Sequence, residues 1–162
     1  MQNLLTAQQL QAAGISEEQA RYALDLLDKV AQARGESPTI TCPSEVVPLL
    51  ADIKDRQREH FVVFYLNARM KVLHRETLSI GSLCASIVHP RELFSVALKL
   101  DQGVASVVLA HNHPSGEVSP SKDDIELTRR LVKAGEILGI EVMDHIIIAS
   151  TEFVSLKEKG LM

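Results

Sequence analysis

The pattern of apolar and polar positions divides the chain into a short N-terminal segment and one larger domain. Residues 1–36 carry apolar side chains at helical spacing, which predicts two short helices. Glycine and proline near their end predict a linker over residues 37–44. The remaining residues, 45–162, alternate between short apolar runs and amphipathic stretches. This alternation predicts a single α/β domain, on which the N-terminal segment packs unless it is the remnant of a larger module.

Two local signals shape the N-terminal segment. Gly14 interrupts the first helical pattern. Ser16-Glu-Glu-Gln19 has the spacing of a capping box and precedes a run of apolar residues at helical spacing. We therefore expect the second helix to begin at Ser16.

Apolar runs predict the strands of the larger domain. The run at Ser106–Ala110 is almost wholly apolar, which is typical of a central strand covered on both faces. A tight turn at Asn67–Arg69 joins the first two strands. The predicted strands cover residues 60–66, 70–79, 86–88, 106–110, 140–149 and 153–155.

Three amphipathic stretches predict helices on this sheet. The first is capped by Ser44 and runs to about Ile53. The second is capped by His89 and has proline at its first position. The third runs from Ser121 to Leu138, with Gly139 as its C-terminal cap. Together the elements predict a mixed sheet flanked by helices.

Composition narrows the class of protein. The chain has 162 residues, 46% of them hydrophobic, and a formal net charge of -4. This size supports one domain with a core, and the acidic balance argues against general nucleic-acid binding. Cys42 and Cys84 form no CxxC pair, which excludes a cysteine-rich zinc site. The N-terminus lacks a signal-peptide pattern and no apolar run reaches the ~20 residues of a membrane span, so we expect a cytoplasmic protein with no membrane partner.

The stretch from His111 to Asp124 carries the candidate chemistry. His111 and His113 share a face if strand geometry continues past the apolar run. Asp124 lies in the first turn of the next helix, where the helix dipole favours a carboxylate. Two imidazoles and one carboxylate are a ligand set for a catalytic zinc ion, since three protein ligands leave the fourth position open.

Each part of this stretch also has a purely structural interpretation. Ser121-Lys-Asp-Asp124 has the spacing of a capping box. A His-x-His pair near a strand end often lies on the protein surface and binds no metal. Asp144 and His145 interrupt an apolar strand, so their side chains need hydrogen-bond partners. They either stabilise the fold or support a zinc-bound imidazole.

The arrangement His111-x-His113, seven residues, then Ser121-x-x-Asp124 resembles the JAMM motif of the JAB/MPN superfamily of zinc metallohydrolases. The local sequence His-Asn-His-Pro-Ser-Gly resembles the RadC branch of that superfamily, which is the UPF0758 group. The resemblance covers residues 45–162 and implies a JAB/MPN-like, cytidine-deaminase-like fold. Its other matching segments are Glu59–Leu66, Val88–Glu92 and Asp144–Ile148.

The resemblance implies roles for five residues. His111, His113 and Asp124 would bind Zn²⁺. Glu59 would be the general base, and Ser121 would assist the oxyanion. Without the family pattern, an exposed acid at a strand edge is the favoured interpretation of Glu59. The other candidate bases are Glu76, Glu92 and Glu117.

The implied activity is hydrolysis of an amide in a peptide or protein substrate, as a peptidase or isopeptidase. The alternatives are a nucleic-acid-associated protein, following the family's DNA-repair label, and a scaffold that binds metal without turnover. RadC-type proteins often carry an N-terminal helix-hairpin-helix module. Gly14-Ile-Ser16 lacks that module's second glycine, so residues 1–36 resemble at most a truncated form of it.

Overall fold

The chain divides into two compact units, Met1–Pro38 and Thr39–Met162. The computed structural model describes residues 37–81, 88–101, 103–150 and 152–162, with Gly14, Ser16 and Gln19. In the first unit, Ser16 Oγ accepts a hydrogen bond from Gln19 N, and Gln19 Oε1 accepts one from Ser16 N. This confirms the capping box. The rest of the two helices predicted over residues 1–36 lies outside the described residues, as do Ser86 and Ile87 of the predicted strand at 86–88.

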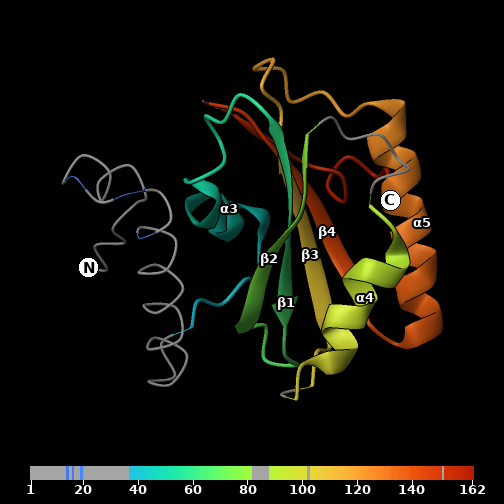
Figure 1. Cartoon of the computed structure of the whole chain (residues 1–162). Helices are drawn as coiled ribbons and strands as arrows, with labels where there is room; N and C mark the ends of the chain where they lie inside the picture. Colours follow the sequence, from blue (N-terminus) through green and yellow to red (C-terminus); the bar gives the residue numbers. More distant parts are fainter. Residues whose placement is uncertain are drawn as a thin grey trace. The chain divides into compact units, whose positions relative to one another are not determined.

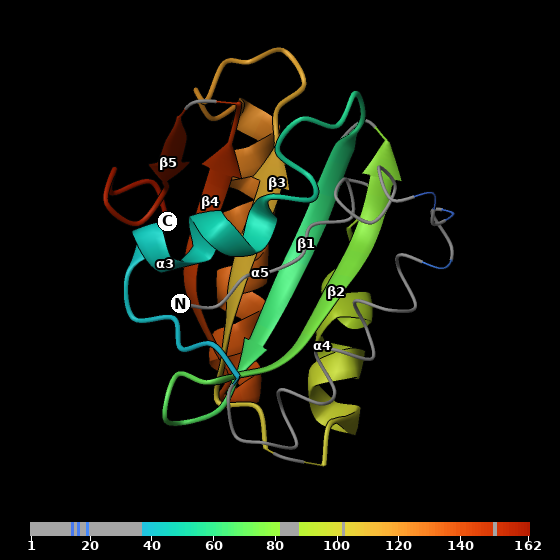
Figure 2. The same cartoon turned by 90° about the vertical axis from the view of Figure 1, so that its left-hand side faces the viewer.

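A mixed five-stranded sheet forms the centre of the second unit, as predicted. Its strands stand in the order β2-β1-β3-β4-β5 (Figure 2). Only the β3–β4 pair among them is parallel, and the other three pairs are antiparallel. The strands are β1 (Glu59–Leu66), β2 (Val72–Gly81), β3 (Ser106–Asn112), β4 (Glu141–Ile148) and β5 (Phe153–Ser155).

Helices cover both faces of the sheet (Figure 1). Helices α4 (Pro90–Lys99) and α5 (Lys122–Leu138) lie on one face, and α3 (Pro43–Val46) with the 3-10 helix η1 (Val47–Leu50) lies on the other. β3 and β4 are parallel, and parallel strands need a crossover connection. Helix α5 makes that connection. Within the described part of the chain, no helix has the length and apolar character of a membrane span.

Alternating side chains of the central strands build a separate core on each face. Phe61, Val63 and Leu109 pack against α4 and α5, whereas Val62, Phe64 and Val108 pack beneath α3 and η1. Every residue of β3 is buried. This confirms the prediction of a central strand at Ser106–Ala110, and the strand runs on to Asn112.

The predicted first helix needs two corrections. Its N-cap is Cys42 and not Ser44, because the Glu45 carboxylate accepts hydrogen bonds from the backbone N–H groups of Thr41 and Cys42. The α-helix also ends at Val46 rather than near Ile53 and continues as η1. Pro48 explains the change, since proline cannot donate an N–H and its ring obstructs an α-helical turn.

The predicted linker is shorter in the structure, and the predicted second strand, residues 70–79, is shifted by two residues to Val72–Gly81. Ile40 is 2% exposed and its N–H donates to Met70 O at 2.9 Å, so residues 39–44 belong to the second unit and not to a linker. β2 begins at Val72 rather than Met70 because Met70 has a φ of 61° and extends the turn. Asn67 Oδ1 stabilises that turn by accepting from the N–H groups of Arg69 and Lys71.

Gly135 marks a tight contact between α5 and its surroundings. A Cβ at this position would lie 2.4 Å from Ile140 O and 3.3 Å from Phe94 Cζ. Gly135→Ala should gain about 1 kcal/mol of helix propensity, but the clash should still lower the free energy of unfolding by about 1–3 kcal/mol. Urea unfolding measures this change.

The matched control for this prediction is Glu136→Ala, an exposed position next in the helix. It should change the free energy of unfolding by no more than about 0.5 kcal/mol. A Gly135→Ala protein more stable than the unsubstituted chain would show that the backbone at Ile140 moves at little cost.

Candidate metal centre

The end of β3 and the residue just beyond it supply two imidazoles on one face of the sheet. His111 is fully buried. The N–H of His113 donates to Ile148 O at 2.9 Å, which continues the pairing with β4 beyond Asn112. The loop predicted to begin at Asn112 therefore begins at His113, and the extended backbone places both side chains on the α5 face as expected.

The N-terminus of α5 supplies the carboxylate. Ser121 is the N-cap: its Oγ accepts from Asp124 N at 3.1 Å and donates to Asp124 Oδ2 at 2.6 Å. Ser121 N also donates to Oδ2. The predicted capping box is thus present, and it orients Asp124 so that Oδ1 faces His111 and Oδ2 lies near His113. Ser121-x-x-Asp124 therefore forms a capping box and, in the same conformation, places the Asp124 carboxylate beside the two histidines.

The three side chains converge on one point. His111 Nε2 lies 2.9 Å from His113 Nε2 and 3.3 Å from Asp124 Oδ1. His113 Nε2 lies 3.6 Å from Asp124 Oδ2. One ligand atom from each residue lies within 4.8 Å of the others, and this is the group of described residues able to hold a metal ion.

The electrostatics of the cluster favour a positive charge at this point. The neighbouring carboxylate of Asp124, the contact with Glu117 O and the charge of Glu59 raise the pKa of His113, although burial opposes them. Burial would raise the pKa of Asp124, but the neighbouring His113 and His111 and the hydrogen bonds from Ser121 hold it well below its usual range. Burial lowers the pKa of His111. The carboxylate is therefore ionised and His111 neutral, as metal binding requires, whereas His113 would give up its proton when a metal binds.

The donor set also fits a metal. His113 Nδ1 lies 2.6 Å from Glu117 O. Because a carbonyl only accepts, Nδ1 carries the proton in the neutral ring and the lone pair lies on Nε2. That lone pair faces an imidazole nitrogen and a carboxylate, so only a proton or a cation between them makes the contact favourable. Zinc accepts this combination of nitrogen and oxygen ligands.

Glu59 lies at the edge of this cluster. It is the first residue of β1, and Phe61 two residues later pairs with His111. Continuing the antiparallel register places Glu59 opposite His113, and its charge acts on the pKa of that histidine. The structure thus brings Glu59 near the ligands without making it one of the three.

The other candidate bases have different surroundings. Glu117 offers its backbone carbonyl to His113. The charge of Glu76 acts on Tyr65, whose pKa it raises together with the larger effect of burial. Glu92 lies in the first turn of α4. These positions favour Glu59 among the four glutamates.

A sequence profile described as the RadC-like JAB domain matches residues 40–161. The chain belongs to the RadC-like JAB domain family. The mixed sheet with its flanking helices agrees with the fold that the family resemblance predicted.

Relatives of the JAB domain carry the family name UPF0758 and no stated activity. A UPF0758 protein of Desulforamulus reducens is 51% identical over 146 residues, which cover 89% of this chain and 63% of the relative. One from Bacillus cereus is 55% identical over 112 residues, which cover 69% of this chain and 49% of the relative. The chain thus spans half to two thirds of the length of these relatives.

Asn112, between the two histidines, is a site residue that sequence reasoning missed. Its fully buried side chain accepts from His60 N at 2.7 Å and donates to Arg56 O and Arg58 O at 3.2 and 3.1 Å. These bonds tie the segment that carries Glu59 to the end of β3, between His111 and His113. The only signal in the sequence was a polar residue at the end of an apolar run.

Asp144 and His145 differ in role: Asp144 stabilises the fold, whereas His145 contacts a candidate metal ligand. Asp144 Oδ2 accepts from Ser155 Oγ at 2.6 Å, and Oδ1 accepts from Lys157 N at 3.1 Å. Its role is structural. His145 instead contacts His111, with 2.8 Å between His145 Nε2 and His111 Nδ1. Burial lowers the pKa of His145 to about 4.

His89 has the structural role predicted for it. Its Nδ1 accepts a hydrogen bond from Arg91 N at 3.1 Å, which caps α4. The predicted N-cap is therefore confirmed.

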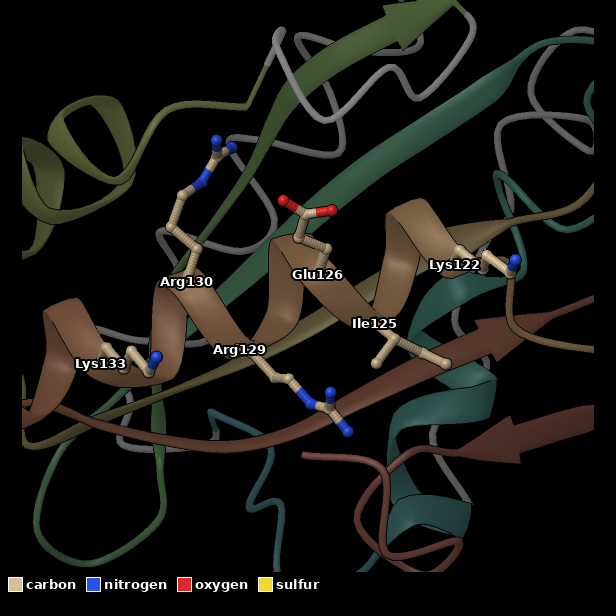
Figure 3. A pocket seen from close by; sticks show the side chains of 6 residues that line it. All are labelled: Lys122, Ile125, Glu126, Arg129, Arg130 and Lys133. Atoms are coloured by element: carbon tan, nitrogen blue, oxygen red, sulfur yellow. The ribbon is translucent and has the colours of Figure 1, made fainter.

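A cationic hollow of about 720 Å³ lies along the exposed face of α5 (Figure 3). It begins at Lys122, two residues before the candidate ligand Asp124. Four cationic side chains and one carboxylate line it, and Arg130 Nη2 also donates to Val88 O at 3.0 Å. Its lining residues are Lys122, Ile125, Glu126, Arg129, Arg130 and Lys133. Four positive charges against one negative charge would favour the approach of anionic groups to this hollow.

Proposed function

We propose that the JAB domain is a zinc-dependent hydrolase that cleaves an amide bond in a peptide or protein, as a peptidase or isopeptidase. The convergence of His111, His113 and Asp124 within 4.8 Å carries this proposal. Three protein ligands are typical of catalytic zinc, whereas structural zinc sites use four. The JAB/MPN superfamily that the motif resembles contains zinc hydrolases, which supports the same conclusion.

The residues around the ligands supply the remaining functions. A zinc ion bound by the three side chains would polarise the amide carbonyl and lower the pKa of a water molecule to about 7. Glu59 would accept a proton from the attacking water and return it to the leaving amine. Ser121 would donate a hydrogen bond to the developing oxyanion, using the hydroxyl proton that it gives to Asp124 Oδ2 in this structure.

Cleavage in isotopically labelled water tests the proposed function. The zinc-loaded chain is incubated with a complex peptide mixture and with isopeptide-linked peptides in H₂¹⁸O. Hydrolysis incorporates ¹⁸O into each new carboxyl group, which mass spectrometry detects. We expect labelled products that depend on zinc and disappear with a chelator. Labelling no greater than in the chelated sample would contradict the proposal for these substrate classes.

A second candidate function is nucleic-acid binding, which the cationic hollow on α5 favours. If nucleic acid binds there, affinity should fall steeply with salt, and Arg129→Glu with Lys133→Glu should weaken it further. Fluorescence anisotropy with labelled single- and double-stranded DNA measures this affinity. Absence of binding at about 50 mM salt would reject this candidate, consistent with the net charge of -4.

A further inference from the structure

A chain of hydrogen bonds runs behind His111, on the side away from the other ligands. His111 Nδ1 lies 2.8 Å from His145 Nε2, and His145 Nδ1 lies 2.6 Å from Thr128 Oγ1. Thr128 Oγ1 donates to Asp124 O at 2.6 Å. The side chains of His111, His145 and Thr128 are fully buried. The chain therefore begins at one ligand and ends on the backbone of another.

The order of protons along this chain follows from its last acceptor. A carbonyl oxygen can only accept, so the single hydroxyl proton of Thr128 points to Asp124 O. The hydroxyl oxygen must then accept from His145, which places a proton on His145 Nδ1. Both ring nitrogens of His145 contact neutral groups, and a buried imidazole without an anionic contact is neutral. Its Nε2 is therefore an acceptor.

The same reasoning determines the form of His111. Because His145 Nε2 accepts, His111 Nδ1 must donate and carries the ring proton. The lone pair of His111 is then left on Nε2, the atom that faces His113 and Asp124. If residue 128 had no hydroxyl group, His145 Nδ1 would have no hydroxyl to donate to, and His145 could carry its proton on Nε2 instead. His111 would then be protonated on Nε2, where it cannot bind a metal.

We propose that Thr128 and His145 are positioning residues that fix the tautomer of His111 and so prepare its Nε2 for the metal. The backbone carbonyl of Asp124 sets the proton order for His111 through two side chains. Histidine ligands usually donate their second N–H to a carboxylate, a carbonyl or water. Here the acceptor is another imidazole, which works only if a third residue fixes that imidazole in turn.

The packing around the two rings holds them in this geometry. Phe61 stacks on His111 with an interplanar angle of 16° and meets His145 edge-on, with ring centroids 5.4 Å apart. Phe61 is fully buried, so its ring shields both imidazoles from water. Because water cannot reach them, the side chains in this row of hydrogen bonds keep their partners. We therefore expect the proton order to persist when no metal ion is bound.

Nitrogen NMR of the metal-free full chain tests the inference directly. Selective ¹⁵N labelling of histidine and two-bond ¹H–¹⁵N correlation distinguish the two neutral tautomers. We expect His111 and His145 both to be protonated on Nδ1 at neutral pH. Resonances are assigned by their loss in single-site histidine variants. Protonation of either ring on Nε2 in the unsubstituted chain would overturn the inference.

Two substitutions at Thr128 test the consequence for metal binding. Thr128→Val keeps the shape and removes the hydroxyl, whereas Thr128→Ser keeps the hydroxyl. Competition with a chromophoric chelator should show zinc affinity about 10–100-fold lower for Thr128→Val and within about threefold of the unsubstituted chain for Thr128→Ser. His111 should shift to the Nε2-protonated form in the valine variant alone.

Equal zinc affinity in the two Thr128 variants would overturn the inference, and the serine variant controls for a general loss of packing. The inference rests on the metal site of the proposed function but not on turnover. If the protein has this proton order but no hydrolytic activity, only the proposed hydrolase function is refuted. A chain that hydrolyses amides with His111 protonated on Nε2 before zinc is added would refute the tautomer inference alone.

Discussion

Replacing His113 with alanine is expected to reduce the zinc content of the purified chain from about one ion to near zero. One of three ligands is lost, and the remaining pair, His111 and Asp124, cannot complete a site of this type. The loss should exceed the roughly 10–100-fold that substitution of a supporting residue costs. His113 suits this test because its side chain is 12% exposed, whereas that of His111 is fully buried. Elemental analysis after gel filtration measures the zinc content.

Thermal unfolding gives an independent readout of the same loss. Zinc that binds only the folded state should stabilise the unsubstituted chain by about 2.7 kcal/mol at a free concentration of one hundred times Kd. His113→Ala should show no such gain. The control is His89→Asn, which keeps an N-cap acceptor for α4 outside the cluster. If His113→Ala retained the zinc content of this control, the proposed metal centre would be rejected.

Helix α5 was predicted closely from local signals in the sequence. Helix α5 begins and ends where Ser121 and Gly139 predicted, because each residue acts on the backbone next to it. Gly139 has a φ of 69°, the left-handed conformation expected of a glycine C-cap. Ile40 shows the opposite case, since its burial depends on pairing with the turn at Met70. No pattern around Ile40 signals that pairing, so the segment resembled a linker.

The candidate site shows the same division between local and distant contacts. The spacing of His111, His113 and Asp124 predicted a cluster because one strand end and the next helix start bring them together. The contacts of Asn112 with Arg56, Arg58 and His60 span 52 to 56 positions and depend on the register of β1 against β3. The sequence contains no local record of that register, so this connection emerged only from the structure.

The role of Glu59 leads to the second large expected effect. Glu59→Gln keeps the shape of the side chain but removes its ability to take a proton. The rate of ¹⁸O incorporation should therefore fall by about 10²–10⁴-fold, the usual contribution of a general base. Zinc content should be unchanged, because Glu59 is not among the three residues that converge on the metal position.

A second glutamate provides the matched control for this substitution. Glu117→Gln leaves the backbone carbonyl that accepts from His113 Nδ1 intact, so both activity and zinc content should stay near those of the unsubstituted chain. Full activity in Glu59→Gln would exclude Glu59 as the base. Loss of zinc in Glu59→Gln would instead make it a ligand. The residue would then complete a four-ligand site, and the open position that hydrolysis requires would be gone.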